Sequence, residues 1–223
     1  MSDHREAILG RVREALRRPT DPHVRSTSAP ATSEPRAWLP AGGDTHDDRV
    51  ALFAEWSDKL KTSFITVADE SQAAGELARI AAEEGWTSVG VHTDPLVQAC
   101  TGQLTVSQLS TDGGYDPAEL EKCDAGITAC DALVAQTGSV VLTTASAGGR
   151  ALSVLPPHHV AIARRDQLLP DLPSAYELLR QRYAAAWPSF MTIISGPSRT
   201  GDIERILVLG AHGPKKLTVI LVG

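Results

Sequence analysis

A polar stretch near the end of the chain, "SGPSRTGDIER" at residues 195–205, combines hydroxyl groups, turn-forming glycines, an arginine and an aspartate directly after an apolar, strand-like run. Backbone N–H groups at the start of a helix or turn bind phosphate or carboxylate, and a guanidinium grips the same groups through two hydrogen bonds. Open α/β sheets usually hold ligands at the carboxyl ends of their strands. We therefore predict an anion-binding loop at that edge, with Arg199 as the clamp and Asp202 orienting Arg199 or a substrate hydroxyl.

The same stretch also has a structural interpretation. It is not a P-loop, because no Gly-Lys-Ser/Thr follows, and Gly196, Ser198 and Gly201 miss the G-x-S-x-G spacing of a nucleophile elbow by one residue. A tight turn whose Ser, Thr and Asp side chains satisfy their own backbone accounts for the residues equally well. Spacing alone leaves both interpretations open.

Two glycine-containing turns supply further candidates. His212 in "LGAHGPKK" is predicted to face the same sheet edge, and histidine can serve as a general acid or base near neutral pH. Thr137 and Gly138 stand at a sharp break between two strands, where the amide of Gln136 can reach a cleft. An ordinary hairpin explains this break almost as well.

Polar residues also occur inside apolar segments. His158 and His159 are adjacent on a predicted strand, so their side chains point to opposite faces and cannot easily ligate one metal ion. No metal site is therefore predicted. Asp131 lies between apolar residues and needs a partner or a ligand if it is buried.

The composition indicates a soluble globular chain and limits its partners. The 223 residues are 42% hydrophobic and 22% charged, with a net charge of −6. This acidity argues against nucleic acid, which needs a basic surface. Three cysteines without a C-x-x-C pair indicate reduced thiols rather than disulfides, a zinc site or an iron–sulfur cluster. Because no membrane-length apolar run and no signal peptide occur, we expect a cytoplasmic protein. We also expect that this chain binds no cofactor of its own.

Three segments are predicted along the chain. Residues 1–18 form an amphipathic helix; its basic face is expected in solvent and its apolar stripe on the body of the protein or on another subunit, such as a second copy, rather than on a membrane. Residues 19–46, rich in Pro, Ser and Thr, form a flexible linker. Residues 47–223 form one α/β domain.

Alternating patterns predict the architecture of that domain. Helical periodicity predicts three main helices, at residues 47–60, 70–84 and 172–187. The third should bury one stripe formed by Tyr176, Leu179 and Tyr183. The middle of the chain is almost continuously apolar without a helical period, which predicts consecutive strands, some antiparallel. The expected fold is a mixed, largely parallel sheet flanked by helices.

Three ordered motifs, "GITACDALVAQTGSVVL", "LSVLPPHHVAIAR" and, most specifically, "ISGPSRTGDIERILVLGAHGPKKLTVILV", together with the start "ILGRVREALRR", resemble the lactate-utilisation protein C family. The shared region of that family is called the LUD domain. The resemblance covers essentially the whole chain apart from the linker. It implies an α/β fold similar to sugar-phosphate isomerases and CoA transferases. It also implies a role in converting L-lactate to pyruvate with two partner proteins, at least one of which carries iron–sulfur clusters.

The resemblance transfers a pattern of residues without an established catalytic assignment. The family usually has an acidic residue before Thr-Gly, where this chain has Gln136. Positions that match the family pattern are Ser195, Gly196, Pro197, Ser198, Arg199, Thr200, Asp202, Glu204, His212, Gly213 and Pro214. Arg199, Asp202 and His212 are the catalytic candidates. The predicted ligand-binding residues are Thr137, Gly138, Ser195, Gly196, Ser198, Arg199, Thr200, Asp202, His212 and Gly213.

Three functions fit these observations. The first is a subunit of a lactate-oxidising system, rather than a redox enzyme alone, with an anionic ligand at residues 195–202 and clusters in a partner. The second is a stand-alone transferase or ligase acting on a small carboxylate, CoA ester or phosphorylated compound, which rests on fold analogy alone. The third is a regulatory or scaffolding protein whose N-terminal helix and linker recruit partners.

Overall fold

A computed structural model describes residues 2–17, 40–200, 208–210 and 212–223. The chain divides into two units, residues 1–39 and 40–223. In the first unit, α1 (Ser2–Arg17) is helical, and its apolar side chains Ile8 and Val12 are exposed. Most of the predicted linker, residues 19–46, lies outside the described residues, and the predicted segment boundaries stay predictions.

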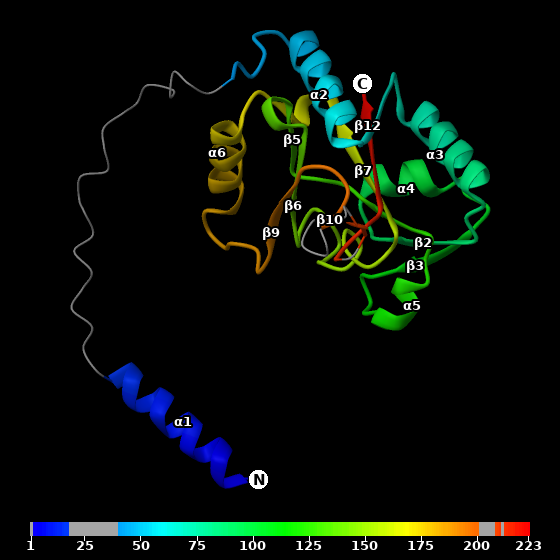
Figure 1. The fold of residues 1–223 in the computed structure, drawn as a ribbon. Coiled ribbons are helices and arrows are strands. Elements are labelled where there is room, and N and C mark those ends of the chain that lie inside the picture. Colours follow the sequence, from blue (N-terminus) through cyan, green and yellow to red (C-terminus); the bar gives the residue numbers. More distant parts are fainter. Residues whose placement is uncertain (1, 18–39, 201–207, 211) are drawn as a thin grey trace. The chain divides into compact units, whose positions relative to one another are not determined.

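The second unit alternates helices and strands along most of its length (Figure 1). Its helices, including two 3-10 turns, are α2 (His46–Leu60), α3 (Glu70–Glu84), α4 (Pro95–Thr101), α5 (Pro117–Glu121), η1 (Ala135–Thr137), η2 (Arg165–Gln167) and α6 (Leu172–Tyr183). Its strands are β1 (Ser63–Val67), β2 (Ser88–Val91), β3 (Ser107–Ser110), β4 (Ala125–Thr128), β5 (Ala132–Val134), β6 (Ser139–Thr143), β7 (His158–Arg164), β8 (Leu168–Leu169), β9 (Met191–Ile194), β10 (Arg199–Thr200), β11 (Val208–Leu209) and β12 (Lys216–Val222).

Across the described residues, the strands form two main sheets. The first is parallel throughout, in the order β1-β12-β7-β4-β2-β3, so the last strand lies beside the first. The second has the order β8-β5-β6-β9 and contains the antiparallel hairpin β5–β6. A short antiparallel ribbon joins β10 to β11. The predicted fold class, a mixed and largely parallel α/β sheet flanked by helices, is confirmed.

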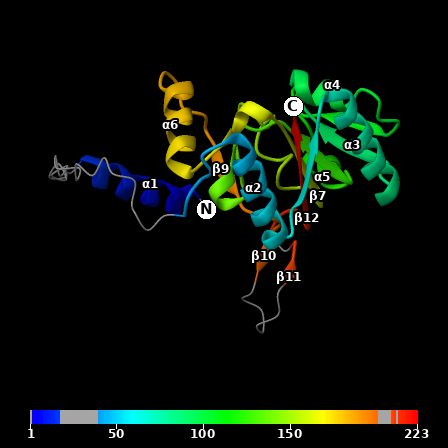
Figure 2. The same ribbon diagram turned by 90° about the horizontal axis from the view of Figure 1, so that it is seen from above.

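The elements stack in layers. Helices α3 and α4 cover one face of the parallel sheet, the second sheet covers the other face, and α6 packs on the far side of the second sheet (Figures 1 and 2). Side chains alternate along each parallel strand, so in β12 Ile220 packs toward the helices and Val219 toward the second sheet. The same alternation in β7 places His158 on the helix side and His159 on the side of the second sheet.

Local chemistry sets where the helices begin. Thr45 accepts a hydrogen bond from the Asp48 N–H, while the Asp48 side chain bonds back to the Thr45 N–H, a capping box at the start of α2. Aspartate side chains accept backbone N–H groups at the start of four further helices, at Asp69, Asp94, Asp116 and Asp171. These caps fix where each connection leaves the sheets.

The buried stripe of α6 differs from the prediction by one position. Ala175 and Leu179 are buried and Tyr183 is partly buried, whereas 52% of Tyr176 is exposed. Residues four apart share one face of a helix, so the stripe runs through positions 175, 179 and 183. The predicted burial of Tyr176 is therefore wrong.

The cysteines behave as predicted, since Cys100, Cys123 and Cys130 are all free and buried. Burial raises the pKa of the Cys100 thiol to about 11, which leaves it protonated and unreactive at neutral pH. In the described part of the chain, no helix combines the length and the apolar character needed to span a membrane.

Candidate functional site

The loop that follows β9 folds back on itself and brings two sequence motifs together. The Ser198 N–H donates to the Pro214 carbonyl over 2.9 Å, and the Gly210 N–H donates to the Ser198 carbonyl over 2.9 Å. Strands β10 and β11 pair just beyond these bonds. Residues 195–200 and 210–214 consequently lie side by side. The predicted site residue Asp202, and Glu204 from the family pattern, lie outside the described residues.

Gly196 makes the first turn of this loop. Its φ of +88° belongs to the region that favours glycine. A Cβ atom there would lie 2.7 Å from the Arg199 Nη2 and 3.0 Å from the Leu60 carbonyl oxygen. Gly196 thus lets the loop approach the end of α2 closely.

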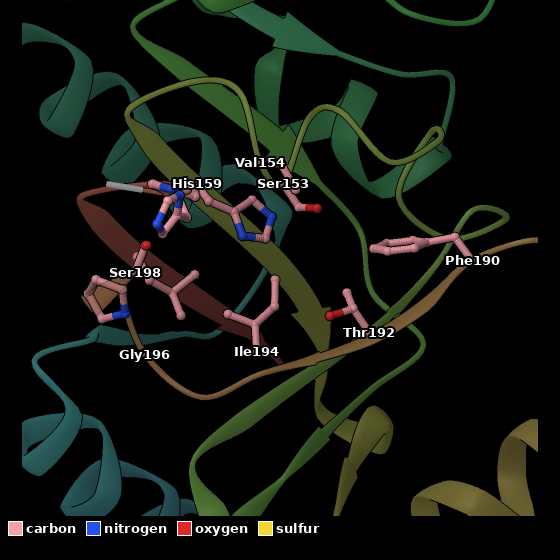
Figure 3. A pocket seen from close by; sticks show the side chains of 13 residues that line it. Ser153, Val154, His159, Phe190, Thr192, Ile194, Gly196 and Ser198 are labelled. Carbon is pink, nitrogen blue, oxygen red and sulfur yellow. The ribbon is translucent and has the colours of Figure 1, made fainter. Parts of the chain in front are cut away.

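A cavity of about 180 Å³ lies between this loop, the start of β7 and the segment that precedes β7. Figure 3 shows the side chains that line it, among them Ser153, His159, Thr192 and Phe190. The residues that line it are Ser153, Val154, His159, Phe190, Thr192, Ile194, Gly196, Pro197, Ser198, His212, Gly213, Pro214 and Leu217. Among the described residues of this lining there is no lysine, arginine, aspartate or glutamate.

His159 is the most unusual residue of the lining. Only 1% of it is exposed, its Nε2 lies 2.9 Å from the Thr128 Oγ1, and its Nδ1 has no hydrogen-bond partner among the described residues. Burial, assisted by the neighbouring charge of His158, lowers the pKa of His159 to about 3. The imidazole is therefore neutral at physiological pH.

The cavity lies at the opposite edge of the parallel sheet from the predicted one. His159 is the second residue of β7 and Leu217 the second of β12, so the cavity adjoins the amino ends of these strands. The prediction applied a rule for parallel sheets to the end of β9. Because β9 belongs to the second sheet and pairs antiparallel with β6, its end does not mark the carboxyl edge of the parallel sheet.

The structure separates the predicted site residues into two groups. Gly196, Ser198, His212 and Gly213 line the cavity. Among those predicted residues whose side chains are described, Thr137, Gly138, Ser195 and Arg199 do not belong to the lining.

The second group makes contacts within the protein. The hydroxyl of Ser139 lies 2.6 Å from that of Ser195 and 2.8 Å from that of Thr137. The Arg199 Nη2 donates to the carbonyl of Leu60, the last residue of α2, over 2.9 Å. A cation that binds a helix carboxyl end satisfies an otherwise unpaired carbonyl and complements the helix dipole. This contact gives Arg199 a structural role, and the anion clamp stays a prediction.

The break at Gly138 is a hairpin turn. Gly138 has φ of +60°, and a Cβ there would lie 2.6 Å from the Cβ of Trp56 in α2. The amide of Gln136, which stands where the family has an acid, is buried and donates from its Nε2 to the Pro40 carbonyl. The described contacts favour the hairpin interpretation.

Asp131 is fully buried and has the partners that its burial demands. Its Oδ1 accepts hydrogen bonds from the Arg182 Nη1 at 2.8 Å and the Tyr183 hydroxyl at 2.6 Å, and its Oδ2 accepts one from the Ser146 hydroxyl at 2.6 Å. Burial first, and then the bond to Asp131, raises the pKa of Tyr183. These four residues, the Asp131 cluster, join the β5–β6 hairpin and the turn that follows it to α6.

His158 points away from the cavity, as strand alternation predicts. Its Nε2 lies 2.8 Å from the Thr218 hydroxyl, its Nδ1 lies 3.1 Å from Glu84, and its ring packs edge-on to Trp86. Over the described ranges, no group of three or more His, Cys, Asp and Glu side chains is arranged to hold a metal ion.

Sequence reasoning considered His159 only as a metal ligand and did not predict its role in the cavity. It also missed the apolar wall formed by Phe190, Ile194 and Leu217. One signal was available, since a histidine in the apolar run "LPPHHVAIA" is expected to be buried and to need a partner.

Comparison with known proteins finds likenesses to one domain family and to one solved fold. Residues 116–222 match the LUD domain family, and these residues include β7, β12 and the whole cavity lining. The matched segment contains the three ordered motifs on which the resemblance rests.

Several relatives extend the likeness. The chain is 29% identical to the uncharacterized protein YkgG of Escherichia coli, covering 99% of this chain and 98% of that protein. It is 28% identical to lactate utilization protein C of Geobacillus kaustophilus, covering 98% and 96%. A DUF162 family protein of Deinococcus radiodurans, solved by crystallography, matches with a TM-score of 0.65 and 24% identity over 80% of this chain and 99% of that chain. This last likeness concerns the fold.

Proposed function

We propose that this protein takes part in the utilisation of L-lactate, as a subunit that acts with iron–sulfur partner proteins during oxidation to pyruvate. The observation that carries the proposal is the likeness to lactate utilization protein C over nearly the full length of both chains. The sequence contains no C-x-x-C pair that would indicate a cluster of its own. On this proposal, electrons pass through clusters held by the partners.

The ligand of this subunit is a separate part of the proposal. We propose that an anion binds at the loop of residues 195–202 and that Arg199 is the cationic side chain, among the described residues, that holds it. Arg199 retains donors beyond the Nη2 that contacts Leu60, because a guanidinium carries five N–H groups. Arg199 does not belong to the lining of the cavity, so an anion held by Arg199 would lie outside it.

Growth on L-lactate as the sole carbon source tests the role. A clean deletion strain should fail to grow on L-lactate, should grow on pyruvate, and should recover on L-lactate when the wild-type chain is restored. The pyruvate arm controls for a general defect. Normal growth of the deletion strain, with no second copy of the gene present, would overturn the proposal and favour the transferase or ligase alternative.

Purified protein distinguishes a subunit from an enzyme that acts alone. The isolated chain should not reduce an artificial electron acceptor with L-lactate, whereas extracts containing the partner proteins should do so only when this chain is present. Oxidation of L-lactate by the isolated chain would contradict the assignment as an accessory subunit.

A further inference from the structure

The inference concerns what the cavity holds, and it is independent of the role in lactate utilisation. Four buried side-chain atoms in the described part of the chain have no hydrogen-bond partner. Of these, the Nδ1 of His159 alone belongs to a residue that lines the cavity. A buried polar atom without a partner costs free energy that a bound molecule can recover.

The hydrogen bond to Thr128 indicates which nitrogen of His159 carries the proton. The ring is neutral, so one nitrogen donates and the other accepts. The Thr128 hydroxyl has no other hydrogen-bond partner among the described residues, and its hydrogen is satisfied only if it points at the Nε2. The Nε2 is then the acceptor, and the Nδ1 carries the hydrogen as a free donor.

The walls of the cavity indicate the rest of the ligand. Apolar side chains from three stretches of the chain surround the space, namely Val154, Phe190, Ile194, Pro197, Pro214 and Leu217. The described lining contains no Lys or Arg, so within it a carboxylate or phosphate beside His159 would be buried without a counter-charge, which is costly. An uncharged group avoids that cost.

Exposure gives the cavity an inner and an outer end. His159 and Ser153 are buried, while His212 and Val154 are exposed. The volume is about 180 Å³, so the ligand, or the part of it that enters, is small.

We propose that the cavity binds a small carbonyl compound, with its uncharged oxygen accepting the Nδ1 hydrogen of His159 and its apolar body against Phe190, Ile194 and Leu217. His159 is then a ligand-binding residue. Thr128, which does not line the cavity, is a positioning residue that fixes the tautomer of the ring.

Two probes of the same shape test the choice of ligand, namely 3-methyl-2-butanone and isobutyrate, with acetone as a smaller ketone. Binding to the full chain is followed by NMR of the ¹⁵N-labelled histidine rings. We expect the Nδ1 of His159 to be protonated and to shift with 3-methyl-2-butanone. The dissociation constant for this ketone should be about tenfold lower than those for isobutyrate and acetone.

Variants then test the two residues. His159→Phe should weaken binding of 3-methyl-2-butanone about tenfold, which corresponds to about 1.4 kcal/mol. Thr128→Val should leave the ring in place but populate both tautomers, seen as a loss of the single protonated Nδ1 signal, with weaker ketone binding. If His159→Phe does not fold, the wild-type spectra and Thr128→Val carry the test.

Three results would each overturn the inference: an unprotonated Nδ1 in the wild type, isobutyrate binding as tightly as the ketone, or no ring shift with any probe. The lactate growth experiment does not affect this outcome. Ketone binding without a growth defect would remove only the proposed function, and a growth defect without ketone binding would remove only this inference.

Discussion

Asp131 and His159 are both buried polar residues, yet they differ in how fully their polar atoms are hydrogen-bonded. The carboxylate of Asp131 accepts three hydrogen bonds from its own chain, and 0% of the residue is exposed. The imidazole of His159, with 1% exposed, leaves one nitrogen unpaired beside a cavity. A buried group that the chain satisfies serves the fold, whereas one that the chain leaves unsatisfied needs a further explanation, which for His159 is the ligand that we propose.

The comparison extends to the surroundings of the two residues. The Asp131 cluster connects two consecutive layers, the second sheet and α6. Its loss should therefore lower the free energy of unfolding. The cavity lies between a strand and a loop. Its disruption should mainly weaken the binding of a ligand. Four substitutions or titrations separate these two expectations.

The largest effect is expected for Asp131→Ala. The change removes the carboxylate that accepts short hydrogen bonds from the Tyr183 and Ser146 hydroxyls and that pairs with Arg182. We expect the free energy of unfolding to fall by about 3 kcal/mol, because a fully buried carboxylate that accepts three hydrogen bonds is lost. Urea unfolding at pH 7 measures it.

Asp166→Asn is the matched control for that substitution. Asp166 is exposed, so the loss of its charge should change the free energy of unfolding by less than about 0.5 kcal/mol. If Asp131→Ala were as mild as this control, the Asp131 cluster would not be the structural member of the pair.

Acid titration gives the next largest effect, and it belongs to His159. Its pKa is about 3 when folded and 6.5 as the model value for an unfolded chain, so the unfolded state binds more protons as pH falls below 6.5. Stability is therefore complete above pH 6.5 and is lost as pH falls toward 3. Between pH 6.5 and 5 this loss should reach about 1.6 kcal/mol, because the slope rises to about 1.36 kcal/mol per pH unit only below the unfolded pKa.

His159→Phe isolates this contribution. The pKa of His158 is also lowered, chiefly by burial, and both chains share its contribution to the pH dependence. Unfolding measured at pH 6.5 and pH 5 should therefore show a smaller loss in the variant than in the wild type. Equal slopes would mean that His159 is not a buried neutral ring.

Much of the fold could be predicted because its signals are local. Helical periodicity gives α2, α3 and α6, and the continuous apolar middle gives the strands from β4 to β7. The need of Asp131 for a partner also follows from its apolar neighbours. The identity of that partner does not, because Arg182 lies 51 residues away and meets Asp131 only once α6 packs on the second sheet.

The errors have the same physical origin. The edge of the sheet was misplaced because strand pairing is non-local, so nothing near Ile194 reveals that β9 pairs with β6 rather than joining the parallel sheet. The free nitrogen of His159 depends on Thr128, 31 residues away. Tyr176 was placed on the wrong face because the phase of a helix depends on what packs against it.

Gly196→Ala should have a smaller effect than the titration and should affect the cavity more than the Asp131 cluster. A Cβ atom at φ +88°, 3.0 Å from the Leu60 carbonyl oxygen, should cost about 1 to 2 kcal/mol of stability and displace the loop that walls the cavity. Gly75→Ala is the matched control, because that glycine lies in α3 with open space around it. It should be neutral or stabilising by up to about 1 kcal/mol.

Urea unfolding and the binding of 3-methyl-2-butanone report on the two properties of Gly196→Ala. Weaker ketone binding with a modest loss of stability is the expected result. Unchanged binding would show that the loop after β9 is not a working wall of the cavity.

The smallest effect is expected for Arg199→Ala, which tests whether this arginine belongs to the fold or to a site. Loss of the hydrogen bond to the Leu60 carbonyl and of a cation at the carboxyl end of α2 should cost about 0.5 to 1 kcal/mol. Binding of 3-methyl-2-butanone should be unchanged, because Arg199 does not line the cavity. Arg180→Ala, which removes an exposed pair with Glu177 on α6, should cost less than about 0.5 kcal/mol.

A stable Arg199→Ala chain that fails to restore growth on L-lactate would contradict the purely structural role and support the anion clamp. Restored growth with the small loss of stability would instead place Arg199 beside Asp131, as a polar residue that the chain uses for its own fold.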